Sequence, residues 1–211
     1  MMNILFIQIP LIISKWFLSL FSFLTGKRLD LMYYHSLGRQ LDLVNEVNGI
    51  KFDASYKTPW SRGERLFSKE PDTIHWIDEI MEPGDIFYDI GANIGTYSLY
   101  AASRNINVYA FEPESSSYAI LNKNIIINSF NAKIKALNIA LNDKNCISVL
   151  NLSNHQPGKS GHSFEKPIDQ DGKKYVPEFK QSCIGYRIDS LIKDYELPIP
   201  NHIKIDVDGN E

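Results

Sequence analysis

The chain has only two cysteines and no strong bias toward either charge. Cys146 and Cys183 stand alone, without the paired spacing of a zinc site. A disulfide framework is therefore disfavoured, and we expect a reducing compartment, by default the cytoplasm. The formal net charge is −3 and no long basic run occurs, so nothing in the composition indicates nucleic-acid binding.

Two common phosphate-binding motifs are also missing. A P-loop requires Gly-Lys-Ser/Thr, which the chain lacks. A dinucleotide site requires G-x-G-x-x-G, but counting from Gly91 the second and third positions hold Asn93 and Thr96. A pyrophosphate ligand is therefore disfavoured, and with it an NAD-dependent oxidoreductase.

The N-terminal segment is mostly apolar from Ile4 to Leu24, with Lys15 in its middle. A spanning helix needs about 20 apolar residues, and a charge at its centre costs about 2.5–3.5 kcal/mol. No basic region precedes the segment and no small-residue cleavage site follows it, which disfavours a cleaved signal peptide. We expect residues 1–28 to form an apolar helix that lies on a membrane surface or docks on another domain, with a membrane anchor as the alternative.

The rest of the chain divides into a helical or mixed lead-in, residues 29–83, and an alternating part, residues 84–211. In the lead-in, apolar spacing predicts a helix that begins at Asp72 or Thr73. The alternating part predicts strands at 86–90, 107–112, 133–141, 146–153 and 202 onward, helices from 96, at 115–129 and near 189, and a polar loop at 154–174. Such alternation is typical of an α/β fold with a Rossmann-like, doubly wound, mostly parallel sheet, to which 146–153 adds a hairpin-like extension.

Polar residues stand where these strands end, and the carboxyl ends of parallel strands meet at one edge of a sheet. Glu112 follows Gly91 by about 20 residues, the spacing at which a carboxylate binds a ribose diol. The turn after Asp89 opens a helix, whose N–H groups attract a carboxylate, while Asp89 can accept from an ammonium group. These features predict a nucleoside ligand without a pyrophosphate, and S-adenosylmethionine fits.

Four stretches together resemble FkbM-type S-adenosylmethionine-dependent methyltransferases: "PGDIFYDIGANIGTYSLYAA", "VYAFEPE", "LNIALND" and "HIKIDVDGNE". The resemblance covers about residues 60–211. It implies the class I methyltransferase fold and O-methylation of a hydroxyl on a sugar, glycan or secondary metabolite. The partner is then a small molecule or glycan rather than a nucleic acid.

The resemblance also implies roles for individual residues. The cofactor loop is formed by Asp89, Gly91, Asn93 and Gly95; Glu112 binds the ribose and Asn138 approaches the adenine edge. Asp206, at the end of the fourth strand, lies beside the transferable methyl and is the candidate base. Lys204, Asp208 and Glu211 belong to the same motif without an assigned role. No metal is required, although Asp206, Asp208 and Glu211 form an alternative divalent-cation site.

Other residues near the motifs receive a structural interpretation. His155 and His162 are expected to be solvated loop residues, and His202 stands at the wrong end of its strand for a base. Tyr97 is expected to pack, with contact to the cofactor as the alternative.

A full class I sheet has seven strands, whereas this sequence stops at Glu211, after the fourth-strand motif. We therefore expect the C-terminal strands to be missing and the last strand to expose an apolar edge. The alternative function is that of an inactive fragment or remnant, which only binds S-adenosylmethionine or a partner.

Overall fold

The computed structural model describes residues 16–20, 22–23, 43–169 and 171–207 of the chain. Two units are distinguished, Met1–Leu43 and Val44–Glu211. In the first unit, residues 16–20 and 22–23 are helical, while the rest of the apolar segment lies outside the described residues. No helix within the described part of the chain is long and apolar enough to cross a membrane. Membrane contact through residues 4–24 stays a prediction.

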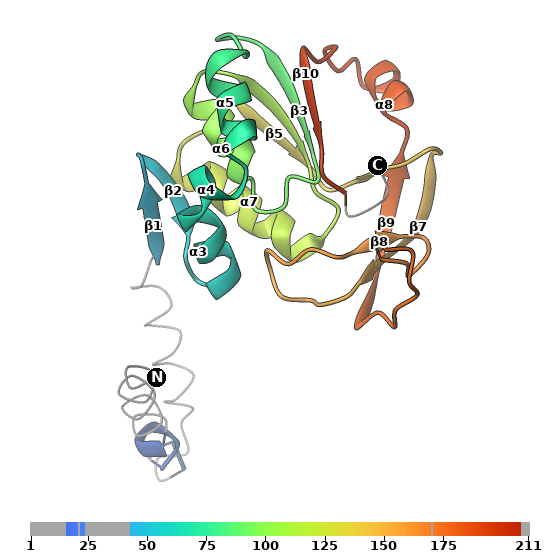
Figure 1. Ribbon diagram of the computed structural model, residues 1–211. Helices are drawn as coiled ribbons and strands as arrows, with labels where there is room; N and C mark the ends of the chain where they lie inside the picture. Colours follow the sequence, from blue (N-terminus) through green and yellow to red (C-terminus); the bar gives the residue numbers. More distant parts are fainter. Residues whose placement is uncertain (1–15, 21, 24–42, 170, 208–211) are drawn as a thin grey trace. The chain divides into compact units, whose positions relative to one another are not determined.

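The second unit is built on a four-stranded sheet in the order β10-β3-β4-β5, with every pair parallel (Figure 1). The order confirms the predicted doubly wound topology, because β3 has β4 on one side and β10 on the other. A change of direction of this kind opens a crevice at the carboxyl ends of the strands. The strands are β3 (Ile86–Ile90), β4 (Asn107–Phe111), β5 (Ile134–Leu137) and β10 (His202–Ile205).

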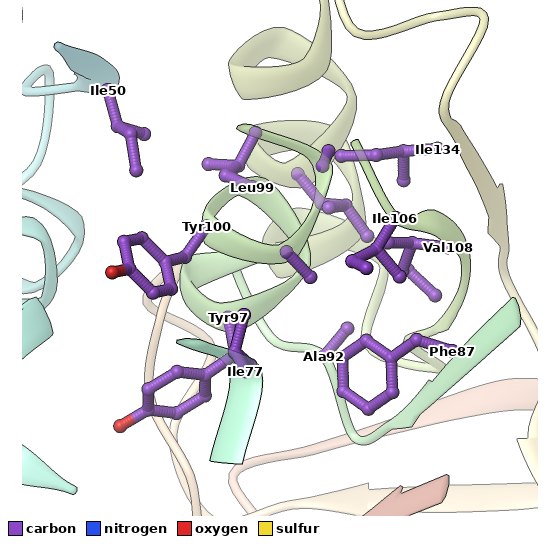
Figure 2. Packing of buried hydrophobic residues seen from close by; sticks show 14 of the residues in the cluster. Ile50, Ile77, Phe87, Ala92, Tyr97, Leu99, Tyr100, Ile106, Val108 and Ile134 are labelled. Atoms are coloured by element: carbon purple, nitrogen blue, oxygen red, sulfur yellow. The ribbon is translucent and has the colours of Figure 1, made fainter. Parts of the chain in front are cut away.

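The two faces of this sheet have different cores, because successive strand residues point to opposite sides. On one face, Phe87 and Val108 belong to one core with Leu99 of a crossover helix (Figure 2). Ile120 of the next crossover helix is part of the same core. On the other face, Tyr88 and its neighbours pack against helix α8. The helices of the first face are α5 (Pro71–Glu79), α6 (Thr96–Ser103) and α7 (Ser115–Ile127), and that of the second face is α8 (Ile188–Asp194).

A second sheet, in the order β6-β9-β7-β8, corrects two predictions. The expected strand 133–141 is interrupted, because Ala140 and Leu141 leave the parallel sheet and pair with β9. The expected polar loop 154–174 contains β8 and a bridge between Ile168 and Lys174. The predicted extension at 146–153 is present as β7, paired antiparallel with β9. The elements are β6 (Ala140–Leu141), β7 (Cys146–Leu152), β8 (Ser163–Phe164) and β9 (Phe179–Tyr186).

The lead-in contains a β-hairpin, which the sequence did not predict, and three helices follow this hairpin. Its strands join through Asn48 and Gly49, both with positive φ, and Phe52 of the second strand is fully buried in the main core. The helix predicted from Asp72 or Thr73 begins earlier, at Pro71, because proline suits the first helical position. The new elements are β1 (Val44–Val47), β2 (Ile50–Asp53), α3 (Lys57–Glu64) and α4 (Leu66–Lys69).

β10 is an edge strand of the parallel sheet in the described residues, as expected. On the α8 face its side chains Ile203 and Ile205 are 44% and 53% exposed. An apolar groove runs beside them and includes Ile90, Ile188 and Val207.

Candidate cofactor site

The glycine turn between β3 and α6 is shaped by main-chain packing. Gly91 has φ +79°, and a Cβ atom there would lie 1.9 Å from the carbonyl oxygen of Asp206. Gly95 has φ +84°, and its Cβ would lie 2.4 Å from a methyl group of Leu121. Asn93, between them, also has positive φ, which asparagine tolerates. Both glycines therefore allow β10 and α7 to approach the turn.

Asp89 is a buried carboxylate at the end of β3. Its Oδ2 accepts a hydrogen bond from Ser98 Oγ at 2.6 Å, whereas Oδ1 has no donor among the described residues. Burial raises the pKa of Asp89, and the Lys204 ammonium opposes this rise. An unpaired buried acceptor has a large desolvation cost, so Oδ1 is suited to a donor supplied by a ligand.

Glu112 follows β4 and is 6% exposed. The backbone N–H groups of Asn93 and Glu114 donate to its Oε2 and Oε1, each at 2.7 Å. Burial raises the pKa of Glu112 to about 8, while these two hydrogen bonds oppose the rise. A carboxylate has about four acceptor positions, so Glu112 can hold the turn and still accept from a ribose hydroxyl.

The two asparagines of the predicted site make different contacts. Asn93 Nδ2 donates to the carbonyl of Lys159 at 2.9 Å. Asn138 Nδ2 donates to the carbonyls of Glu112 and Pro113, at 2.8 and 3.0 Å. Asn138 thus fixes the end of β4, and its contact with an adenine edge stays a prediction.

Asp206 and Lys204 lie on the same side of β10, two residues apart. Lys204 Nζ donates to Asp206 Oδ2 at 3.0 Å, and its side chain is only 10% exposed. The ammonium lies 5.3 Å from the ring centroid of Tyr97, which is buried. Burial and the nearby Glu70 carboxylate raise the pKa of Tyr97, so its phenol stays neutral. Side chains along a strand alternate between its two faces, so the sequence alone could have predicted that Lys204 and Asp206 lie on the same side.

A cavity of about 170 Å³ joins most of these residues at the carboxyl end of the sheet. Gly91, Asn93, Glu112 and Asp206 line it, together with an apolar wall of Ile139, Leu141, Leu150 and Phe164. A smaller adjoining hollow is lined by Asp89, Gly91, Tyr97, Lys204 and Asp206. The structure therefore brings Asp89, Gly91, Asn93, Glu112 and Asp206 together around these two hollows. Gly95 and Asn138 do not line either hollow and instead hold the surrounding backbone in place.

Sequence reasoning missed the residues that reach the cavity from distant segments. Arg62 of α3 lines both hollows and donates from Nε to the carbonyl of Gly158 at 2.6 Å. Lys159 and His162 line the main cavity, and His162 is a half-buried loop residue there. Its Nδ1 accepts from the backbone N–H of Ser153, which stabilises its place in the wall. Arg62, Lys159 and His162 are distant from the glycine turn in the sequence, so no motif spacing could predict that they reach the cavity.

His202 lies outside the cavity. His202 binds Asp85 Oδ2 at 2.9 Å and stacks edge-on against Trp76, at the opposite end of β10. Asp208 and Glu211, named for an alternative cation site, lie outside the described residues. No group of three histidine, cysteine, aspartate or glutamate side chains suited to a metal ion occurs among the residues the structure describes.

Two adjacent parallel strands each end in a carboxylate, and these carboxylates lie around a turn that opens a helix, beside an apolar wall. This arrangement defines the Rossmann-like class of nucleoside-binding proteins. Within that class, the chain belongs to the family described as the Methyltransferase FkbM domain, whose model matches residues 89–211, more than half of its length. This is a family of methyltransferases.

Two curated relatives of the chain are named as methyltransferases. The chain is 30% identical over 145 residues to the hexuronic acid methyltransferase AglP of Haloferax volcanii, covering 67% of this chain and 53% of that protein. It is 26% identical over 166 residues to the methyltransferase sdnD of Sordaria araneosa, covering 68% and 64%. The chain thus spans between half and two thirds of the length of these relatives. Among solved structures, it resembles M. jannaschii TYW2 in complex with AdoMet at 23% identity and a TM-score of 0.35, covering 44% of this chain and 41% of that one.

Proposed function

We propose that this protein binds S-adenosylmethionine in the cavity at the carboxyl end of the parallel sheet and takes part in O-methylation. The observation that carries the proposal is the pair of carboxylates, Asp89 and Glu112, at the ends of β3 and β4. A nucleoside with a charged amino-acid end matches this pair. Glu112 accepts from the ribose hydroxyls, and the apolar wall that includes Leu150 and Phe164 contacts the adenine.

The amino-acid end of the cofactor fits the smaller hollow. The buried Oδ1 of Asp89, which has no donor among the described residues, accepts from the ammonium group. Gly91 has no side chain, so the backbone at Asp206 can approach the turn that borders this hollow. When bound, S-adenosylmethionine would supply an electrophilic methyl group that passes from its sulfonium to a substrate oxygen.

The residues around the cavity act chiefly by orientation and proton acceptance. Asp206 lines both hollows and is the candidate base for the proton of an acceptor hydroxyl. The acceptor we propose is a hydroxyl on a sugar, a glycan or a small metabolite. The name of AglP, a hexuronic acid methyltransferase, supports the sugar class.

Calorimetry with S-adenosylhomocysteine tests the cofactor part of the proposal. The wild-type chain should bind with micromolar affinity and Glu112→Ala should abolish the binding. Glu79→Ala, on the exposed side of α5, is the matched carboxylate control and should leave the affinity unchanged. Absence of binding by a folded wild-type chain would overturn the proposal.

Methyl transfer is tested separately with radiolabelled S-adenosylmethionine and a panel of sugar and glycan acceptors. Label in an acceptor supports the transferase. A chain that binds the cofactor but labels no acceptor, even when extended by downstream sequence from its gene, supports a remnant that only binds.

A further inference from the structure

We propose that Lys204 is a positioning residue of the cofactor site: its ammonium group holds Asp206 by a hydrogen bond and balances the negative charge of Asp89, so that Asp89 can bind the ammonium of the cofactor. This inference rests on the proposed function. It assigns a role to a motif residue that spacing alone left unexplained.

The position of Lys204 is set by the sheet. In the parallel register, Lys204 lies opposite Asp89 on the neighbouring strand β3, and their side chains emerge on the same face. The Lys204 side chain is 10% exposed, compared with 47% for Asp206. The Lys204 ammonium therefore lies inside the hollow, whereas the Asp206 carboxylate lies at its solvent-exposed opening. The ring of Tyr97, 5.3 Å from the ammonium, forms one wall of this location.

The charges around this location require a cation. Asp89 is buried, its Oδ1 lacks a donor among the described residues, and Asp206 adds a second negative charge to the same hollow. Two carboxylates at close range repel each other, and a positive charge near both offsets this repulsion. Lys204 interacts electrostatically with Asp89 and donates to Asp206.

Other groups bordering this hollow do not replace Lys204. Arg62 is directed to the carbonyl of Gly158, Arg65 Nε to that of Ser61, and Lys69 forms an ion pair with Glu70. Among the described residues, the other titratable and charged groups that line this hollow are Tyr97 on α6, Asp206 directly after β10, Arg62 on α3, Arg65 between α3 and α4, and Lys69 on α4. Glu70, directly after α4, acts on Tyr97.

The proposal predicts how cofactor binding depends on pH. Only the ionised Asp89 carboxylate accepts well from an ammonium, so affinity falls as the pH decreases through its pKa. Loss of the Lys204 charge would raise that pKa further, because an opposite charge at close range lowers the pKa of a carboxyl by about 1–3 units. The pH below which binding weakens should therefore move upward by about one unit in Lys204→Gln.

The test is calorimetry of S-adenosylhomocysteine binding between about pH 5 and 8.5 for wild type, Lys204→Gln and Lys204→Arg. Glutamine keeps a hydrogen-bond donor for Asp206 but loses the charge, whereas arginine keeps the charge and should retain the wild-type midpoint. Lys135→Gln is the matched control, because Lys135 also lies over a tyrosine ring, at 5.2 Å from Tyr109, and donates to its hydroxyl outside the cavity. Thermal unfolding of each variant measures a purely structural effect.

A second ligand separates Asp89-mediated binding from other effects. 5′-Methylthioadenosine lacks the ammonium and carboxylate, so its affinity should be equal in wild type and Lys204→Gln. An unchanged pH midpoint in folded Lys204→Gln, or an affinity loss equal at every pH, would overturn the role of Lys204. If Lys204→Gln does not fold, a shifted midpoint in Lys204→Arg would likewise overturn it. Absence of binding by wild type would instead overturn the proposed function itself.

Discussion

Gly91 and Gly172 have nearly the same positive φ, +79° and +76°, but different surroundings. A Cβ at Gly172 would meet no atom within 4 Å, whereas one at Gly91 would overlap the carbonyl of Asp206. Strand β10 must therefore retreat if position 91 carries a side chain. The conformational cost is common to both glycines, and the steric cost is specific to Gly91.

We predict that Gly172→Ala lowers the free energy of unfolding by about 1 kcal/mol, the cost of a left-handed conformation. Gly91→Ala should lower it by about 3 kcal/mol or more, because overlap with main chain is added. Urea denaturation of both variants measures the difference. Equal losses in the two variants would show that β10 does not pack against the turn as described.

At the scale of elements, Asn124 joins three segments that are distant in the chain. It lies on α7 with no exposed surface, and its Oδ1 accepts from the backbone N–H of Asp53 in β2 at 2.7 Å. Its Nδ2 donates to the carbonyl of Ile94 in the glycine turn at 2.9 Å. One amide therefore ties the lead-in hairpin and the turn to the same helix.

We predict that Asn124→Leu lowers the free energy of unfolding by about 2–4 kcal/mol, because it leaves two buried backbone groups unpaired. Asn122→Leu is the control on the same helix, since in the described part of the chain the Asn122 side chain bonds to the carbonyl of Tyr118 within α7 alone and is partly exposed. Its effect should stay within about 0.5 kcal/mol. Urea denaturation distinguishes the two, and similar stabilities would contradict the role of Asn124.

At the scale of the whole second unit, residues 154–162 connect the second sheet to the cofactor turn. Lys159 accepts from Asn93 Nδ2 through its carbonyl, and the backbone N–H of Gly158 donates to Ser117 Oγ at 3.0 Å. Arg62 adds a bond from α3 to the carbonyl of Gly158. This segment is a wall of the cavity and is held by the glycine turn, by α7 and by α3.

We predict that S-adenosylhomocysteine slows tryptic cleavage after Lys159 several-fold, because a ligand in the cavity stabilises the wall against local opening. Lys173, in an exposed turn whose backbone N–H donates to Asp169, is the internal control and should be cleaved at the same rate with and without the ligand. Mass spectrometry of timed digests measures both rates. Equal protection at the two sites would indicate general stabilisation rather than closure of this wall.

Much of the fold could be predicted because strong local patterns coincide with strands of the parallel sheet. The buried runs at β3 and β4 and the glycine turn were located correctly, and with them the common edge that holds Asp89, Glu112 and Asp206. The interruption of the strand 133–141 could not be predicted, since Ala140 and Leu141 look apolar in either sheet. Their assignment depends on β9, more than 40 residues further along the chain, which the reading did not identify.

By itself, the sequence determined the class of fold, the family and the chemical types at the carboxyl edge, because these depend on short-range spacing of apolar, glycine and acidic residues. Only the tertiary structure decided how those residues act: that Gly91 admits the carbonyl of Asp206, and that Lys204 lies beside Asp89. Only the tertiary structure also brought Arg62 and His162 into the cavity wall. The physical reason is that burial, charge balance and close approach depend on atoms from distant segments, which spacing along one chain does not encode.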